Sequence, residues 1–130
     1  DAGLDVFYCP ESPVTVALSP GDSKILETGL KFGVPHGYML EVKNRSSVAA
    51  KKSLIVGACV VDSGYDGEVF INLHNVGAGM QVVSPGDKIA QLVLTPVVHF
   101  RPVETTEDTL YTYPMTISDR GHGALGSTDG

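Results

Sequence analysis

The sequence predicts an all-β domain of the sandwich or barrel type. Glycine and proline recur at short intervals, as in Cys9-Pro10, Ser19-Pro20-Gly21 and Ser84-Pro85-Gly86, and short runs of alternating apolar residues lie between them. Helical periodicity is nearly absent. A chain of 130 residues can bury one hydrophobic core but has little room for a second. We therefore expect a single domain to carry the function.

Five strands are expected from these runs. They share either period-two alternation or an unbroken apolar, β-branched composition, and they cover residues 14–18, 38–42, 54–61, 68–75 and 89–98. Strands 54–61 and 68–75 should form a hairpin, with Val69, Ile71 and Leu73 on its inward face. A helical turn or two is expected only over 46–52, where Ser46 or Ser47 could cap a run that contains two alanines.

The turn of this hairpin is the most distinctive stretch, Asp62-Ser63-Gly64-Tyr65-Asp66-Gly67-Glu68. Gly64 and Gly67 permit positive φ and leave backbone N–H and C=O groups uncovered, so main chain alone could recognise a flat ligand. Asp62 stands where a strand ends, half shielded and able to act as a base. Taken alone, the stretch is more typical of an ordinary solvated turn, because turns use Asp and Gly anyway.

Composition excludes several classes of function. The formal charge is −6, with 9 Lys and Arg against 15 Asp and Glu, which argues against binding nucleic acid through its phosphates. A polyanionic ligand would have to be held by a few local cations. Cys9 and Cys59 match no metal-binding spacing, and the four histidines are too scattered to form a ligand set. With no signal peptide or long apolar span, we expect no membrane association and no secretion, but a cytoplasmic protein, or one of the host cytoplasm or nucleus if viral.

The character of the chain changes near Phe100. We expect a β-rich core over 1–100, a tether over 101–119 that is rich in Thr, Pro and acids, and a flexible glycine-rich arm over 120–130. Glycine content alone would make 120–130 a disordered tail. Arg120, Ser127 and Thr128 would be unusual choices for a mere tail, which favours a functional arm.

Five stretches occur in an order that resembles the five motifs of the trimeric dUTPases. They are Ala2-Gly3-Leu4-Asp5-Val6, Asn44-Arg45-Ser46-Ser47, the Asp62 turn, Pro85-Gly86-Asp87-Lys88-Ile89-Ala90-Gln91-Leu92, and residues 120–128 from Arg120 to Thr128. The resemblance spans residues 2 to 128. It implies a distorted jelly-roll, β-clip-like fold and a homotrimer with active sites at the subunit interfaces, each closed by a C-terminal arm.

The resemblance implies hydrolysis of dUTP to dUMP and pyrophosphate. Asp62 matches the aspartate that activates the attacking water, and aspartate is ionised at neutral pH. Tyr65 matches the tyrosine that lies against deoxyribose and leaves no room for a 2′-hydroxyl. Backbone groups of the turn, including Gly64 and Gly67, would pair with uracil and leave buried groups unpaired against cytosine.

The other motifs would bind the phosphates. Arg45, Ser46 and Ser47 match the second motif, Asp5 the acid that supports its arginine, and Gln91 a glutamine near the phosphates; taken alone, Arg45 would be a surface ion pair. In the family Mg²⁺ is held mainly by triphosphate oxygens and waters, so no direct protein ligand is expected. The arm residues that would close over the nucleotide are Arg120, Leu125, Gly126, Ser127 and Thr128.

The chain departs from the family pattern at several positions. Leu125 stands where Phe commonly stacks on uracil, so we predict weaker nucleotide affinity than in a relative with Phe. Lys88 replaces the usual Arg and Asn44 the usual Pro or Gly. Asp66 adds a negative charge close to the turn, and the sequence offers no reason for it.

Two other readings compete with dUTP hydrolysis. A dCTP deaminase shares fold and motifs, but its deaminating glutamate would stand at Asn72, and an amide cannot shuttle the required protons. The second is a dUTPase-like regulatory scaffold that binds nucleotide or a partner protein with little turnover. The tether, with Tyr111 and Tyr113, is where such a partner would bind.

Overall fold

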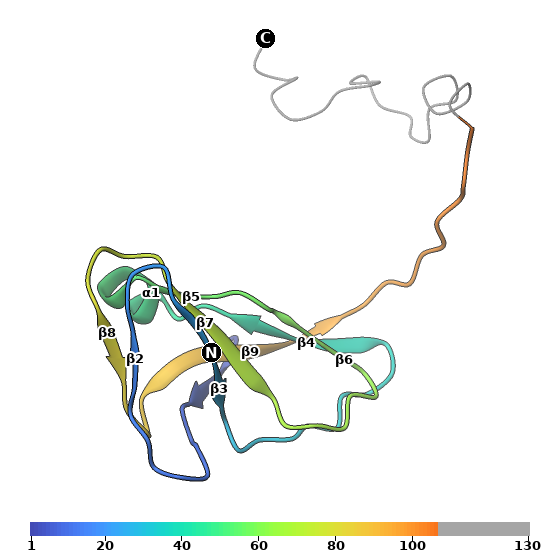
Figure 1. Cartoon of the computed structure of the whole chain (residues 1–130). Coiled ribbons are helices and arrows are strands. Elements are labelled where there is room, and N and C mark those ends of the chain that lie inside the picture. Colours follow the sequence, from blue (N-terminus) through green and yellow to red (C-terminus); the bar gives the residue numbers. More distant parts are fainter. Residues whose placement is uncertain (107–130) are drawn as a thin grey trace. The chain divides into compact units, whose positions relative to one another are not determined.

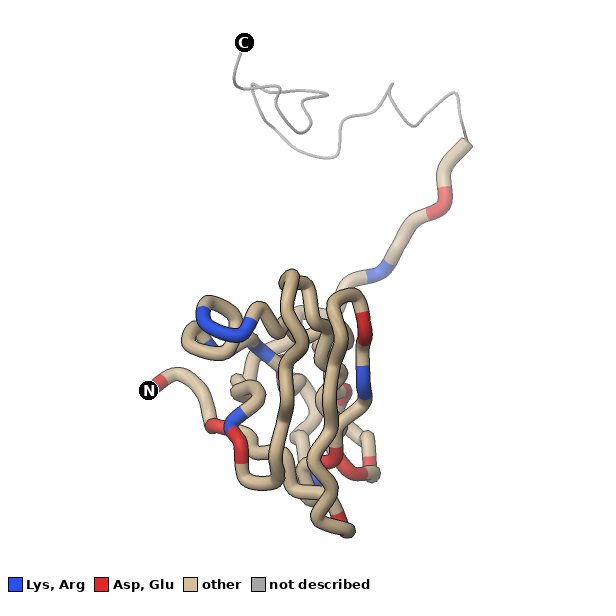
Figure 2. Tube along the Cα trace, turned by 60° about the vertical axis from the view of Figure 1, so that its left-hand side comes forward, with Lys and Arg blue, Asp and Glu red and all other residues tan. Residues whose placement is uncertain are grey.

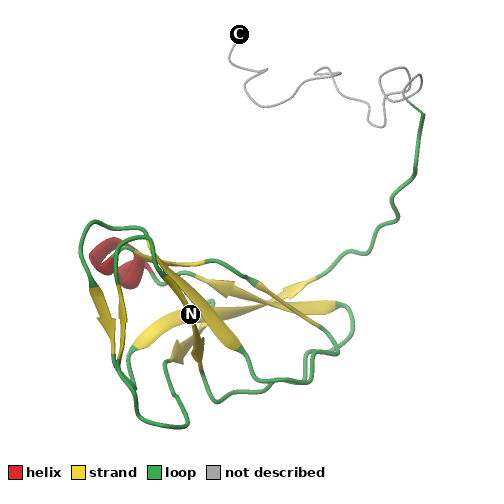
Figure 3. Cartoon of the chain, in the orientation of Figure 1, coloured by secondary structure: helices red, strands yellow, loops and turns green. Residues whose placement is uncertain are grey.

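The computed structural model describes residues 1–106, and its elements are almost all strands. The chain divides into two units, Asp1–His99 and a second that begins at Phe100. The described residues contain nine strands and one helix (Figures 1 and 3). In chain order they are β1 (Leu4–Phe7), β2 (Val16–Leu18), β3 (Ser23–Glu27), β4 (Tyr38–Lys43), α1 (Ser46–Lys52), β5 (Leu54–Val56), β6 (Val60–Asp62), β7 (Phe70–Asn75), β8 (Gln81–Val83) and β9 (Lys88–Pro96). The predicted all-β class is confirmed.

The strands form three antiparallel sheets. The largest has the order β1-β9-β4-β6, the second has the order β3-β7-β5, and β2 pairs with β8. Strand β9 occupies the interior of the largest sheet, where it pairs with β4 along Tyr38–Lys43 and with β1 at Asp5↔Gln91. This register brings the first and fourth sequence motifs onto adjacent strands.

The core follows from the alternation that the sequence displays. In β7, Ile71 and Leu73 are fully buried and the preceding Val69 is 2% exposed, so the predicted inward face is confirmed. Leu40 and Val42 are buried on one face of β4. Full burial of one such aliphatic side chain contributes about 1.5–3 kcal/mol. These residues belong to one core cluster, which holds the three sheets together.

The predicted strand over 54–61 is wrong as a single element. The run breaks at Gly57. Before the break, β5 belongs to the three-stranded sheet, and after it β6 belongs to the four-stranded sheet. The Gly57 N–H donates to Asn72 O at 2.9 Å, and a Cβ on Gly57 would collide with His74 Nε2 and Asn72 Oδ1. The predicted hairpin is therefore also corrected. Strand β7 pairs with β5, β6 pairs with β4, and residues 57–69 form the long connection between β5 and β7.

Helix α1 is confirmed at the predicted position, but its cap is not. Arg45, in an extended conformation with φ −91° and ψ 133°, is the N-cap, and within residues 1–106 its side chain makes no capping hydrogen bond. Ser46 and Ser47 are the first helical residues and are exposed. The helix ends at Lys52, and the C-cap residue Ser53 adopts a left-handed φ of 54°.

The second unit is described only from Phe100 to residue 106. These residues have neither strand nor helix and are exposed. The predicted tether over 101–119 is thus described in part, and the predicted arm over 120–130 lies outside the described residues. Across residues 1–106, none of the helical structure is long and apolar enough to cross a membrane.

Candidate active site

One cleft gathers residues from three of the predicted motifs. It has a volume of about 450 Å³ and is lined by Asp1, Ala2, Gly3, Asp5, Arg45, Ser46, Ser47 and Gln91. We call it the Arg45 cleft. Strand pairing accounts for the gathering, because Gln91 lies opposite Asp5 on one side and opposite Lys43, just before α1, on the other.

Asp5 organises the cations of the Arg45 cleft. Its Oδ1 accepts from Arg45 Nε at 2.9 Å, and its Oδ2 lies 3.5 Å from Lys88 Nζ. The pair is made through Nε, which carries one of the five N–H donors of the guanidinium, so donors remain for an anion. Basic residues are otherwise dispersed along the described trace (Figure 2), with Lys51 and Lys52 adjacent at the end of α1. Arg45 is therefore the cation that this cleft presents.

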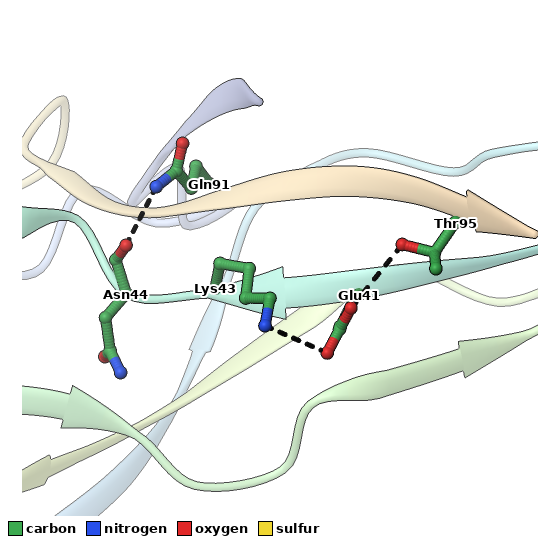
Figure 4. Close-up of polar contacts among 5 residues, drawn as sticks. All are labelled: Glu41, Lys43, Asn44, Gln91 and Thr95. Carbon is green, nitrogen blue, oxygen red and sulfur yellow. Dashed lines mark hydrogen bonds and ion pairs between the residues drawn. The ribbon is translucent and has the colours of Figure 1, made fainter. Parts of the chain in front are cut away.

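Gln91 is held in place from two sides. Its Nε2 donates to Asn44 O at 2.9 Å (Figure 4), and a Cβ on Gly3 would collide with its Oε1. Asn44 in turn accepts from Val56 N through its side-chain Oδ1 at 2.8 Å. Asn44, a departure from the family pattern, thus ties β9 and β5 to the turn that delivers Arg45.

The strand before that turn carries a second ion pair. Lys43 Nζ lies 3.1 Å from Glu41 Oε1, and Thr95 donates to Glu41 Oε2 at 3.5 Å (Figure 4). These side chains lie on the same outward face of β4 and β9 as Gln91, because Glu41 and Lys43 alternate with the buried Leu40 and Val42. Lys43 is therefore paired with Glu41 of its own strand, and it does not line the Arg45 cleft.

A second, smaller cleft contains the predicted base and the predicted sugar-binding ring. Its volume is about 230 Å³, and its lining residues are Val60, Val61, Asp62, Tyr65, Glu68, Val69 and Phe70. We call it the Asp62 cleft. Asp62 ends β6, and its carbonyl accepts from Tyr65 N at 3.2 Å, which closes a turn at Gly64 with φ 86°. Asp62 is exposed in the single chain, in contrast to the half-shielded position expected from the sequence.

Gly67 does not have the positive φ that the sequence suggested for it. Among residues 1–106 it is not one of the glycines with positive φ, whereas Gly64 is. A Cβ on Gly67 would overlap the Tyr65 ring and hydroxyl, so the absence of a side chain lets the ring fold back over the loop. The Tyr65 hydroxyl then donates to Glu68 O at 2.6 Å.

Asp66 has a partner that the sequence did not reveal. Its Oδ1 lies 3.2 Å from Lys31 Nζ, and both side chains are largely exposed. The extra negative charge next to the Asp62 cleft is therefore balanced by a cation from the segment after β3. Lys31 is distant in sequence, and no pattern around it points to this pairing.

The two clefts are separate within one chain. They share none of the described lining residues. Asp62 lies opposite Met39 at one end of β4, and Gln91 lies opposite Lys43 at the other end. At about 3.3 Å per residue, the two positions are roughly 13 Å apart along the strand. The predicted site residues are thus brought together as two groups and not as one.

The remaining predicted site residues cannot be placed. Arg120, Leu125, Gly126, Ser127 and Thr128 lie outside the described residues. Sequence reasoning gave no role to Gly3, Lys88, Thr28 and Glu68, which belong to the two clefts or support them. Gly3, Lys88 and Glu68 lie within the matched motifs, whereas Thr28 had no local signal.

Comparisons with known proteins identify the family of the chain. A family model described as dUTPase matches residues 1–123. A deoxyuridine 5′-triphosphate nucleotidohydrolase of Desulfotalea psychrophila is 36% identical over 129 residues, covering 98% of this chain and 80% of the relative.

Two solved structures of phage enzymes share the fold. A dUTPase variant of Staphylococcus bacteriophage 80alpha with dUpNHpp has a TM-score of 0.80 and 25% identity, over 98% of this chain and 86% of that one. A dUTPase variant from phage phi11 of S. aureus, described with a coordinated structural Mg(II) ion, has a TM-score of 0.70 and 27% identity, over 82% of this chain and 86% of that one. The match in family, sequence and fold extends across both clefts, and the chain therefore belongs to the dUTPase family, the dUTP diphosphatases.

Proposed function

We propose that this chain hydrolyses dUTP to dUMP and pyrophosphate, with Asp62 activating the attacking water. The observation that carries the proposal is the grouping of the motif residues into two clefts. The Asp62 cleft offers a carboxylate beside an aromatic ring, and the Arg45 cleft offers a guanidinium beside hydroxyl and amide groups. Cleavage between the α- and β-phosphates needs both kinds of group.

The Asp62 cleft would bind the nucleoside. The Tyr65 ring, held over Gly67, would lie against C2′ of deoxyribose and exclude a ribose hydroxyl. Backbone groups of the loop from Asp62 to Glu68 would pair with uracil. A site that hydrogen-bonds its substrate in this way can reject an analogue with mismatched groups by about 10⁴-fold or more.

The Arg45 cleft would bind the triphosphate. Arg45 would donate its terminal nitrogens to phosphate oxygens, and the exposed Ser46 and Ser47 would add hydroxyl contacts near the scissile bridge. Gln91, fixed by Asn44, would hold the water network beside them. The chain carries a net charge of −6, so this local cation matters for retaining a polyanion.

We further propose that Mg²⁺ is required and that it is carried by the substrate. The metal would neutralise charge on the triphosphate. Both oxygens of Asp5 already face the cations Arg45 and Lys88, which makes this carboxylate a poorer direct ligand for a second cation. The residues therefore fit an ion held through phosphate oxygens and waters, as Mg²⁺ favours.

A complete site would combine two copies of the chain. A base must lie within hydrogen-bond reach of the water that it activates, and that water must lie at the bound phosphates. The two clefts of one chain are roughly 13 Å apart along β4, which is too far for both conditions. We propose a homotrimer in which the Asp62 cleft of one subunit faces the Arg45 cleft of another. The arm residues Arg120, Leu125, Gly126, Ser127 and Thr128 would then close over the nucleotide.

The competing functions have less support. The Asn72 amide accepts from Ala58 N at 3.4 Å and pairs with His74 Nε2 at 2.9 Å, so it braces the crossover between β5 and β6 and does not line the Asp62 cleft. This argues against a deaminase. The exposed free thiols of Cys9 and Cys59 support our proposal that the protein acts in a reducing compartment, the cytoplasm or, in a host, the cytoplasm or nucleus.

The deciding experiment measures pyrophosphate release from dUTP, dCTP, dTTP and UTP, each with Mg²⁺ and with chelator. We expect metal-dependent release from dUTP alone. Light scattering of the same sample should give three chains per particle. Binding of dUTP without release from any nucleotide would contradict the hydrolase and favour the regulatory scaffold.

A further inference from the structure

The loop that carries Tyr65 is fastened to the segment that follows β3. Glu68 Oε2 accepts from two backbone donors, Thr28 N at 3.2 Å and Gly29 N at 3.1 Å. The backbone on either side is joined as well, because Val69 N donates to Leu30 O at 2.8 Å. Between β6 and β7 the described loop forms no strand, so these contacts hold it in place instead of strand pairing.

The same residue also holds the tyrosine. The Tyr65 hydroxyl donates to Glu68 O at 2.6 Å, while the ring lies over Gly67. Glu68 therefore binds the Tyr65 hydroxyl through its backbone carbonyl, and it binds the backbone N–H groups of Thr28 and Gly29 through its carboxylate. We call these three hydrogen bonds, from Thr28 N, Gly29 N and Tyr65 Oη to Glu68, the Glu68 network.

Thr28 provides a rigid base for this network. It is 4% exposed, and its hydroxyl donates to Val69 O at 2.6 Å while accepting from Leu30 N at 3.2 Å. The Thr28 hydroxyl thus has both an acceptor and a donor as partners. A charged acceptor that receives two backbone N–H groups forms strong hydrogen bonds, roughly twice as strong as neutral ones.

We propose that Glu68 is a positioning residue that sets the discrimination between deoxyribose and ribose. The inference rests on the proposed function, in which Tyr65 lies against C2′ of the sugar. A ring excludes a hydroxyl group only if it cannot retreat, and a displacement of about 1 Å is enough to lose such selectivity. The Glu68 network prevents that retreat by tying the Tyr65 hydroxyl to the buried base at Thr28.

Two variants of Glu68 separate this role from general stability. Both backbone donors point to one oxygen, so the amide oxygen of Glu68→Gln can still accept from both, whereas Glu68→Leu removes the acceptor. We would measure kcat/KM for dUTP and for UTP with the full chain and Mg²⁺. In Glu68→Leu we expect the dUTP/UTP ratio to fall about tenfold or more. Glu68→Gln should restore most of that ratio.

The matched control is Lys31→Gln. It breaks the exposed ion pair to Asp66 between the same two segments without touching the Glu68 network, so the ratio should stay at the wild-type value. Thermal unfolding would establish that every variant is folded. A purely structural role would lower kcat/KM for both nucleotides equally, and an unchanged ratio in a folded Glu68→Leu variant would overturn the proposal. An equal fall in Lys31→Gln would overturn it too.

Failure of this inference is distinguishable from failure of the proposed function. If the wild type does not hydrolyse dUTP, or hydrolyses UTP equally well, the proposed function is wrong before any variant is made. If the wild type prefers dUTP and the Glu68→Leu ratio is unchanged, only the role of Glu68 is wrong.

Discussion

Asp5 and Arg45 form a hydrogen-bonded ion pair, with Nε 2.9 Å from Oδ1, between the first strand and the start of the helix. The pair uses the Nε–H donor to orient the guanidinium, which has further N–H donors for a ligand. Its side chains are partly exposed, so its contribution to the free energy of unfolding is small, about 1 kcal/mol or less. Its importance therefore lies in the geometry of Arg45.

We predict that Asp5→Ala lowers kcat for dUTP by roughly ten- to hundredfold without raising KM. The alanine releases Arg45 from its orientation, and small misplacements cost this much in rate, while the lost negative charge favours triphosphate binding. Asp5→Asn should lose less, because an amide oxygen can still accept from Nε. Steady-state kinetics checks both variants, and a raised KM at unchanged kcat would contradict the orienting role.

Asp62→Asn should abolish most turnover while nucleotide still binds. The amide keeps the size of the side chain but cannot take a proton, and general-base catalysis contributes about 10²–10⁴-fold in rate. Pyrophosphate release measures turnover, and calorimetry with dUTP in chelator measures binding. The matched variant is Asp66→Asn, which lies four residues along the same loop and pairs with Lys31. It should hydrolyse dUTP almost normally, and near-normal turnover in Asp62→Asn would refute the assignment of the base.

Gly3→Ala should act through Gln91. The added methyl group would collide with Gln91 Oε1, the end of a flexible side chain, so Gln91 should give up its hydrogen bond to Asn44 O. Loss of one such bond lowers kcat/KM by about three- to tenfold. Gly33→Ala is the control, since within the described chain the space at its Cβ position is open.

A double variant sharpens this test. If Gly3→Ala works only by displacing Gln91, it should add little to the loss already caused by Gln91→Ala, because both changes remove the same contact. Fully additive losses in kcat/KM would show that Gly3 has another role in the cleft.

Leu125→Phe should strengthen nucleotide binding. The prediction comes from the sequence alone, since Leu125 lies outside the described residues. An aromatic ring can stack on uracil, and such a contact adds about 0.5–1.5 kcal/mol, or roughly two- to tenfold in Kd. Calorimetric titration with a non-hydrolysable dUTP analogue gives the Kd. Leu125→Ile, which stays aliphatic, should leave it unchanged, and an equal Kd in the Phe variant would remove stacking as the explanation.

Much of the fold could be predicted because local patterns report burial. The alternation through Ile71 and Leu73 and the apolar run of β9 identified strands that the structure contains. The change of sheet at Gly57 could not be predicted, because β5 and β6 have the same β-branched composition and only their partners differ. The predicted cap of α1 was wrong for a similar reason. Two adjacent serines favoured a capping role, but the N-cap lies one residue earlier, at Arg45.

The candidate site shows the same division. The motif residues Asp5, Arg45 and Gln91 were predicted, and strand register gathers them. The support of the loop that carries Tyr65 was not predicted, because the hydrogen bond from Thr28 N to Glu68 joins segments forty positions apart and its donor is a backbone group. A partner for Asp66 was equally invisible until Lys31 was placed beside it.

The position of β9 has a consequence for how the enzyme is made. This strand pairs with β1 and β4 in the largest sheet, so the Arg45 cleft does not exist until the last strand of the core has emerged from the ribosome. Pairing of β1 with β9 is a contact of very high sequence separation, and such topologies fold slowly, in milliseconds to seconds. Nascent chains should therefore stay exposed to chaperones until translation has passed β9, and phosphate binding should appear only after β9 has paired with β1 and β4.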